Sequence, residues 1–154
     1  MPARETIVLP PNHAGIFEAA RILREGGLAA FPTETVYGLG ANATDGRAVA
    51  GIFEAKDRPR FNPLIVHVAN LEAASEIALV EGDALRLAQA FWPGPLSLVL
   101  PLRPEAGLSD LVTAGLSTVA VRVPDLALAR ALLAEARVPV AAPSANRSGR
   151  ISPT

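Results

Sequence analysis

Residues 27–40 read Gly-Leu-Ala-Ala-Phe-Pro-Thr-Glu-Thr-Val-Tyr-Gly-Leu-Gly, and this stretch decides the fold class. Residues 28–31 form a short apolar run that is typical of a buried strand, and Pro32 ends it. Two threonines, a glutamate and a tyrosine follow beside two glycines, which let backbone N–H groups approach a ligand. Ligands tend to bind where the strands of an α/β sheet end. The stretch therefore predicts either a ligand-binding loop or a polar turn between a strand and a helix.

Helical and extended patterns alternate on both sides of this stretch. We expect strands at residues 7–9 (an edge strand), 28–31, 64–68, 97–102, 118–123 and 138–142. We expect helices that begin at Asn12, Asp45, Asn70, Asp83 and Leu126 and end near residues 26, 56, 78, 92 and 136. Two helices follow one another after residue 68, and two strands follow one another around residue 110. This order predicts an α/β (α+β) fold, with one mixed sheet and helices packed on it.

Length and composition narrow the class of protein. The 154 residues suffice for a single domain with its own hydrophobic core. The net charge of −1 excludes a protein that binds nucleic acid by bulk positive charge, and the lack of cysteine excludes a cysteine nucleophile or a cysteine-rich zinc site. No segment offers 18 uninterrupted apolar residues, and the N-terminus lacks the layout of a signal peptide. We therefore expect a cytoplasmic protein.

The basic residues comprise thirteen arginines and a single lysine, Lys56. A GC-rich genome explains an excess of arginine, but it leaves open why one lysine is kept, since an ammonium is a compact charge whose pKa moves readily. Residues 56–62, Lys-Asp-Arg-Pro-Arg-Phe-Asn, place three cations and an amide within seven positions. Such a cluster can hold a phosphate, with Arg58 as a fork and Lys56 as a point charge. Alternatively, these residues only complement the C-terminus of the preceding helix.

Three further features carry polar groups in apolar surroundings. His67 lies in the strand pattern Leu-Ile-Val-His-Val, where it is either a core histidine or a ligand. Arg122 lies in an apolar strand and needs an anionic partner, which Glu34, Asp125 or a bound ligand could supply. Residues 142–154 follow an apolar strand, and their serines, asparagine and two arginines predict a polyanion site or a flexible linker. These residue types favour nucleotide binding and phosphate-centred transfer without a covalent enzyme intermediate.

These segments, in this order, resemble the YrdC-like family, the threonylcarbamoyl-AMP synthases of tRNA modification. The resemblance runs through residues 32–40, 56–67, 92–96, 119–124 and 143–154. It implies an enzyme, a nucleotidyltransferase that joins L-threonine, bicarbonate or CO2, and ATP into threonylcarbamoyl-AMP with release of pyrophosphate. It also implies a YrdC-like, open, twisted mixed sheet, and a separate complex that transfers the threonylcarbamoyl group to tRNA. The family's catalytic fold continues past the Ser-Pro-Thr segment, so the resemblance implies one domain over residues 1–154 that is incomplete at its C-terminal end.

The resemblance also implies a role for individual residues. L-threonine would be bound by Thr35, His67, Arg122 and the backbone of Ala142. ATP would be bound by Arg58, Asn62, Thr118, Ser144, Asn146 and Ser152. Lys56 and Arg58 would be catalytic, with Mg2+ carried on the ATP phosphates and no metal held by the protein. Two alternatives remain open: an RNA-binding module for double-stranded RNA or tRNA, and a domain of a carbamoyltransferase that handles carbamoyl-adenylate.

Overall fold

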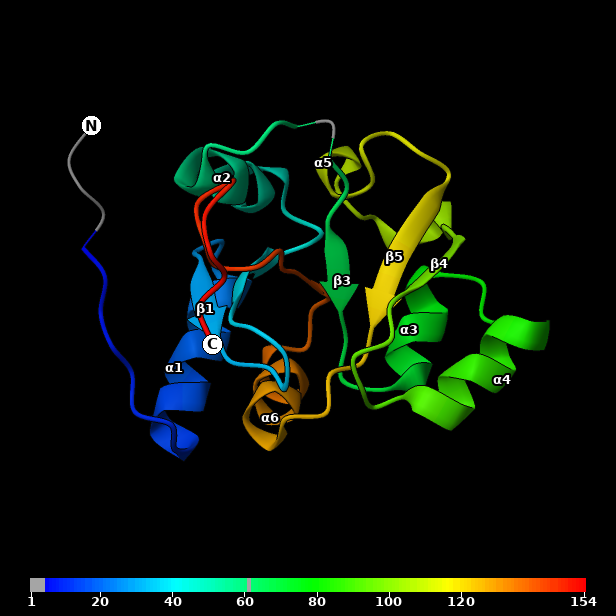
Figure 1. Cartoon of the computed structure of the whole chain (residues 1–154), viewed down its shortest axis with the longest axis horizontal. Helices are drawn as coiled ribbons and strands as arrows, with labels where there is room; N and C mark the ends of the chain where they lie inside the picture. Colours follow the sequence, from blue (N-terminus) through cyan, green and yellow to red (C-terminus); the bar gives the residue numbers. More distant parts are fainter. Residues whose placement is uncertain (1–4, 61) are drawn as a thin grey trace.

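The computed structural model describes residues 5–60 and 62–154 (Figure 1). The strands are β1 (Ala29–Phe31), β2 (Gly38–Asn42), β3 (Ile65–His67), β4 (Leu98–Pro101), β5 (Thr118–Arg122) and β6 (Val140–Ala141). The α-helices are α1 (His13–Arg24), α2 (Gly46–Lys56), α3 (Leu71–Ile77), α4 (Gly82–Phe91), α5 (Asp110–Thr113) and α6 (Ala127–Ala136).

The strands of the described chain form one sheet in the order β1–β2–β6–β3–β5–β4. Strands β3 and β5 run parallel, and the other neighbouring pairs are antiparallel. The parallel pair joins distant parts of the chain, because Ile65 lies opposite Ala120 and His67 lies opposite Arg122. The predicted α/β fold with one mixed sheet is therefore confirmed.

The helices begin and end largely where the sequence predicts. The side chains of Asn12, Asp45 and Asn70 each accept hydrogen bonds from backbone N–H groups of the first helical turn, at 2.8–3.2 Å. After α1, Gly26 adopts a φ of +89°, which a residue with a Cβ rarely does. Helix α4 differs slightly, because its N-cap residue is Glu81 rather than Asp83. No helix within the described ranges is long and apolar enough to cross a membrane.

Hydrophobic cores lie on both faces of the sheet. On one face, α2, α3 and α5 pack against the strands, and Ile52, Val66 and Val121 lie in the centre of this core. On the other face, α1 and α6 lie side by side and cover Phe31 and Val140 (Figure 1). Successive residues of β6 alternate between the two cores, as the period of a strand requires.

Two features of the N-terminal third differ from the sequence-based expectations. The edge strand expected at residues 7–9 is wrong: these residues form no strand, and Val8 is 94% exposed. Strand β2 was not predicted, because glycine and asparagine are depleted in strands. Packing requires glycine there, since a Cβ on Gly40 would lie within 2.9 Å of the side chains of Val140 and Phe31. In addition, the connection between the expected strands at 97–102 and 118–123 contains the 3₁₀ helix Pro104–Ala106 and helix α5.

Candidate active site

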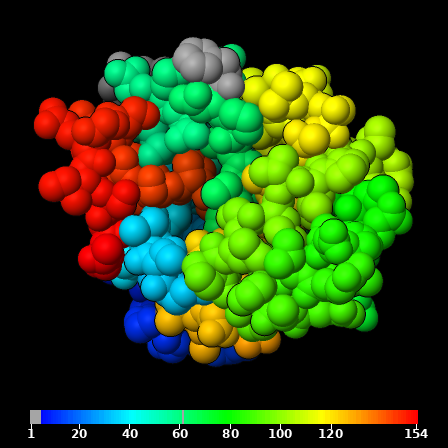
Figure 2. Space-filling model, turned by 45° about the vertical axis from the view of Figure 1, so that its right-hand side comes forward, coloured from blue at the N-terminus to red at the C-terminus, as the bar shows by residue number. Residues whose placement is uncertain are grey.

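The α1–α6 face of the sheet is only partly covered. In β5, Thr118 and Ala120 are half-buried, whereas Val119 and Val121, which point to the other face, are buried. In β3, Ile65 is likewise half-buried. Figure 2 shows a hollow between the cyan segment that follows β1, the orange-red segment that follows β6 and green parts of the chain. Side chains on this face can therefore meet a bound molecule.

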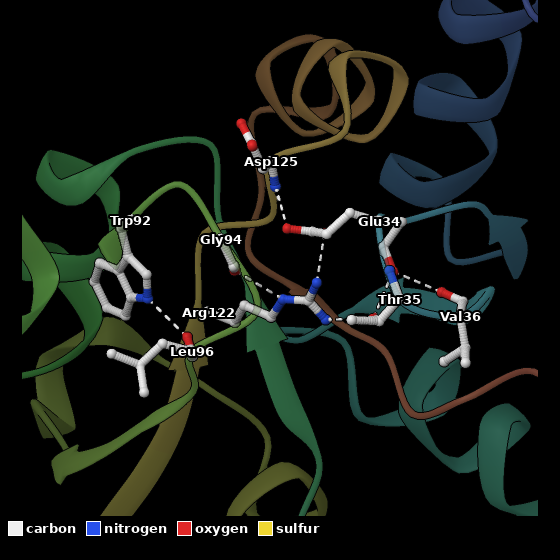
Figure 3. Close-up of polar contacts among 9 residues, drawn as sticks. Glu34, Thr35, Val36, Trp92, Gly94, Leu96, Arg122 and Asp125 are labelled. Carbon is white, nitrogen blue, oxygen red and sulfur yellow. Dashed lines mark hydrogen bonds and ion pairs between the residues drawn. The ribbon is translucent and has the colours of Figure 1, made fainter. Parts of the chain in front are cut away.

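Arg122 ends β5 and is held from three directions (Figure 3). Its Nε donates to the carbonyl of Gly94 at 3.1 Å, its Nη1 to Oγ1 of Thr35 at 3.1 Å, and its Nη2 to Oε1 of Glu34 at 2.5 Å. Of the partners that the sequence left open, Glu34 is therefore the protein carboxylate that pairs with Arg122. A guanidinium has five N–H groups, so Nη1 and Nη2 each keep one N–H beyond these contacts.

The turn at residues 92–96 supports Arg122 from the opposite side. The indole Nε1 of Trp92 donates to the carbonyl of Leu96 at 2.7 Å, which ties the turn to itself. The backbone N–H of Gly94 donates to the carbonyl of Val123 at 2.8 Å, so the Gly94 carbonyl is held beside the end of β5. This hydrogen bond gives the tryptophan a structural role in the turn. The carbonyl contact to Arg122 had no signal in the sequence.

His67 lies next to Arg122 in the sheet register and points to the same face. It is 4% exposed, and its ring meets the edge of Phe31 at 6.1 Å between centroids, with the planes at 86°. Its Nδ1 is 3.1 Å from the carbonyl of Ile65. Burial, and then the charge of Arg122, lower the pKa of His67 to about 4, so the ring is neutral at pH 7. Ala142 lies on the same face, and its N–H donates to the carbonyl of Ile65 at 3.0 Å.

Lys56 is buried at the C-terminal end of α2, with only 2% of its surface exposed. Its Nζ donates to the backbone carbonyls of Ser144 and Asn146, and its own carbonyl accepts from the N–H of Ser148 at 3.1 Å. Burial, followed by the charge of Arg58, lowers the pKa of Lys56 below its usual value. The only lysine of the chain therefore fastens the segment after β6 to α2, which the sequence did not reveal.

Arg58 follows Lys56 and carries an unused donor. Its Nη2 donates to the carbonyl of Pro63 at 3.2 Å, while its Nε is buried and has no hydrogen-bond partner among the described residues. Burial lowers the pKa of Arg58 below its usual value. A buried N–H without an acceptor is costly, so an anion at this point would be favourable. Asn62 is half-buried near the start of β3, at the same end of the sheet as Thr118.

The segment 143–154 is pinned to the loop after β1 and to the start of β2. The N–H groups of Tyr37 and Leu39 donate to the carbonyls of Pro153 and Pro143, at 2.9 and 2.8 Å. Within the segment, Oγ of Ser152 donates to Oδ1 of Asn146 at 3.1 Å. These contacts favour a fixed loop over the flexible linker that the sequence left open. The segment therefore presents Ser144, Asn146 and Ser152 from a fixed position.

A second hollow, of about 380 Å³, lies between the end of α2 and the turn after β6. Its lining is mixed in charge and comprises Glu54, Ala55, Lys56, Asp57, Arg147, Ser148 and Arg150. Within the described ranges, no group of three or more His, Asp or Glu side chains is arranged to hold a metal ion. The structure thus brings Thr35 and His67 to Arg122. It brings the segment with Ser144, Asn146 and Ser152 to Lys56.

Comparisons with known proteins extend this description. The family model Sua5_yciO_yrdC, described as "Telomere recombination", matches residues 21–154. A threonylcarbamoyl-AMP synthase of Bacillus subtilis is 54% identical over 95% of this chain, and one of Pyrococcus abyssi is 55% identical over 88% of it. The P. abyssi Sua5 structure complexed with L-threonine superposes on 93% of the chain with a TM-score of 0.88 and 52% identity.

The chain spans only about two fifths of these relatives, covering 42% of the B. subtilis protein, 40% of the P. abyssi protein and 42% of the P. abyssi structure. The full-length HypF structure in its phosphate- and nucleotide-bound form is a more distant neighbour, at 25% identity and a TM-score of 0.77 over 90% of this chain and 21% of that protein. The family match covers most of the 154 residues, and the fold agrees with it. The chain therefore belongs to the Sua5/YciO/YrdC family.

Proposed function

We propose that this chain carries the substrate-binding face of a threonylcarbamoyl-AMP synthase, an enzyme that uses L-threonine, bicarbonate or CO2, and ATP. The observation that carries the proposal is the pair of cationic groups at the two ends of β3. Arg58 lies before the strand and has a buried Nε–H without an acceptor among the described residues, and Arg122 lies beside the end of the strand. Arg58 is hydrogen-bonded to the carbonyl of Pro63, and Arg122 lies opposite His67. Because an extended strand from residue 63 to residue 67 is about 13 Å long, the two cationic groups are separated by roughly that distance. Two anionic substrates can therefore bind the same face and meet between these groups.

L-threonine is proposed to bind at the Arg122 end. Its carboxylate would take the N–H groups that Nη1 and Nη2 of Arg122 keep. Thr35 contacts Arg122, and His67 lies opposite Arg122 in the sheet register. Together with the backbone of Ala142, which lies on the same face against Ile65, they would surround the rest of the amino acid. The likeness to a relative complexed with L-threonine supports this placement.

ATP is proposed to bind at the Arg58 end. The buried Nε–H of Arg58 would donate to a phosphate, and Lys56 would lie beside the α-phosphate. Polar groups for the remainder of the nucleotide come from the start of β3, the start of β5 and the pinned segment: Asn62, Thr118, Ser144, Asn146 and Ser152. Mg2+ would arrive with the phosphates and neutralise part of their charge.

The reaction then proceeds by positioning and electrostatics, with no protein nucleophile. The threonine amine adds to CO2 and forms an N–C bond, and the released proton leaves to solvent. An oxygen of the resulting carbamate attacks the α-phosphorus of ATP in line, forming an O–P bond. The bond between the α-phosphorus and the bridging oxygen breaks, and pyrophosphate leaves. Lys56 and Arg58 stabilise the charge that develops on the phosphate oxygens. A separate complex would then pass the threonylcarbamoyl group to tRNA.

The proposal is tested by incubating the chain with ATP, MgCl2, bicarbonate and L-threonine. Pyrophosphate release is followed by a coupled assay, and the adenylate product is identified by mass spectrometry. We expect release that requires both threonine and bicarbonate. Release without threonine would favour the carbamoyl-adenylate reaction instead. If the chain binds RNA but binds neither L-threonine nor ATP, the RNA-binding module is favoured.

A further inference from the structure

The groups around Arg122 carry a balanced charge. Arg122 contributes one positive charge, and the carboxylate of Glu34, at 2.5 Å, contributes one negative charge. His67 lies beside Arg122 and is neutral at pH 7, because its pKa is about 4. The side chain of Asp125 lies 4.0 Å from Arg130 and is paired there. The charge at this end of β5 therefore sums to zero, as does the charge of an α-amino acid zwitterion.

Glu34 also fixes the direction of the guanidinium. Its Oε1 accepts from Nη2 of Arg122, and its Oε2 accepts from the backbone N–H of Asp125 at 2.8 Å (Figure 3). Because both oxygens are engaged, the carboxylate cannot rotate without losing one of these contacts. The carbonyl of Gly94 holds Nε from the other side. Arg122 is thus fixed in an orientation in which one N–H on each terminal nitrogen has no acceptor in the described part of the chain.

We propose that Glu34 is a positioning and specificity-determining residue, which holds Arg122 for the substrate carboxylate and selects a zwitterionic amino acid over a carboxylate that lacks an ammonium group. This inference rests on the proposed function, since it requires L-threonine to bind at Arg122. An unpaired arginine in a poorly hydrated site attracts any carboxylate. An arginine already paired with a glutamate has little net charge to offer, so a ligand that brings its own positive charge is favoured.

The test compares two ligands that differ in one group. (R)-3-hydroxybutyrate has the carboxylate and hydroxyl of L-threonine but no ammonium. Calorimetric titration of the full chain gives a dissociation constant for each ligand, and we expect L-threonine to bind at least tenfold more tightly. Glu34→Gln keeps the size of the side chain and one acceptor oxygen but loses the charge. In this variant, the 3-hydroxybutyrate constant divided by the L-threonine constant should fall about tenfold, which corresponds to about 1.4 kcal/mol.

Two further variants separate charge from folding. Glu34→Asp keeps the negative charge on a shorter side chain, so it should preserve the ratio even where both ligands bind more weakly. Glu105→Gln is the matched control, because it removes an exposed pair with Arg103 at 3.9 Å and should leave the ratio unchanged. Partial unfolding of a variant would weaken the apparent binding of both ligands by the same factor. The ratio of the two dissociation constants therefore depends only on how the folded site distinguishes the ligands.

The outcomes distinguish the inference from the function on which it rests. If Glu34→Gln keeps the ratio of the unchanged chain, the inference is overturned, while tight L-threonine binding leaves the proposed function standing. If the unchanged chain binds no L-threonine, the proposed function and the inference both fail. A lowered ratio in Glu34→Gln that Glu34→Asp does not share supports the inference.

Discussion

Acid should destabilise this protein through one buried side chain, His67. The ring is 4% exposed, and its pKa of about 4 lies below the ordinary value of 6.5 because burial and the charge of Arg122 oppose protonation. Between these two pH values, the unfolded chain binds a proton that the folded chain does not. The free energy of unfolding therefore falls as the pH falls from about 6.5 and stops falling, for this residue, below about 4.

The size of the effect follows from the two pKa values. The full difference corresponds to about 3 kcal/mol, of which about 2 kcal/mol is lost between pH 7 and pH 5. Such a loss is a large part of the stability of a typical domain. Carboxylates also titrate towards the acid end of this range, so the contribution of His67 has to be isolated by substitution.

His67→Gln removes the titrating ring and keeps an N–H donor for the carbonyl of Ile65. Urea unfolding at pH 7, 6 and 5 should show a stability loss about 2 kcal/mol smaller in this variant than in the unchanged chain. The other histidine provides the control: His13 is exposed in the first turn of α1, and His13→Gln should lose as much as the unchanged chain. Equal losses in His67→Gln and the unchanged chain would refute the argument that burial keeps His67 neutral.

Three other substitutions test the site and its support. Lys56→Arg should lower turnover roughly 100-fold in the pyrophosphate assay, because a wide guanidinium would replace the compact ammonium of a side chain that is only 2% exposed. The control Arg86→Lys, on the surface of α4, should leave turnover unchanged. Arg58→Gln should weaken ATP binding about tenfold in calorimetry, without changing the L-threonine constant. Phe31→Ala should lower the free energy of unfolding by about 3–5 kcal/mol in urea titrations, because the Phe31 side chain is buried in the core. Phe17 is 51% exposed, so Phe17→Ala should lower it by less than about 0.5 kcal/mol.

The sequence predicted the parts of the fold that local chemistry controls. Asn12, Asp45 and Asn70 begin helices because a short polar side chain accepts the unpaired N–H groups of the first turn. The alternation in residues 64–68 placed His67 on the face opposite Val66, because side chains of a strand point alternately to either face. By contrast, β2 could not be predicted, since glycine at position 40 is required by the neighbouring strands and not by its own backbone.

The candidate site, too, could be predicted from the sequence only in part. The residue types alone left both a ligand-binding and a structural role open for Lys56, Arg58, His67 and Arg122. They could not decide between Glu34 and Asp125 as the partner of Arg122. Those residues lie 88 and 3 positions away in the chain, and the nearer carboxylate contributes only its backbone N–H.

The sequence by itself determined most of the helices and strands, the candidate site residues and the resemblance to the family. Tertiary structure decided which of those residues meet. Lys56 reaches the carbonyls of Ser144 and Asn146 across 88 and 90 positions, and Glu34 reaches Arg122 across 88. Such pairs are set by the strand order and by the registers of β2, β6, β3 and β5, which bring the loops at the strand ends together. Local propensity carries no information about that packing, so only the folded chain shows it.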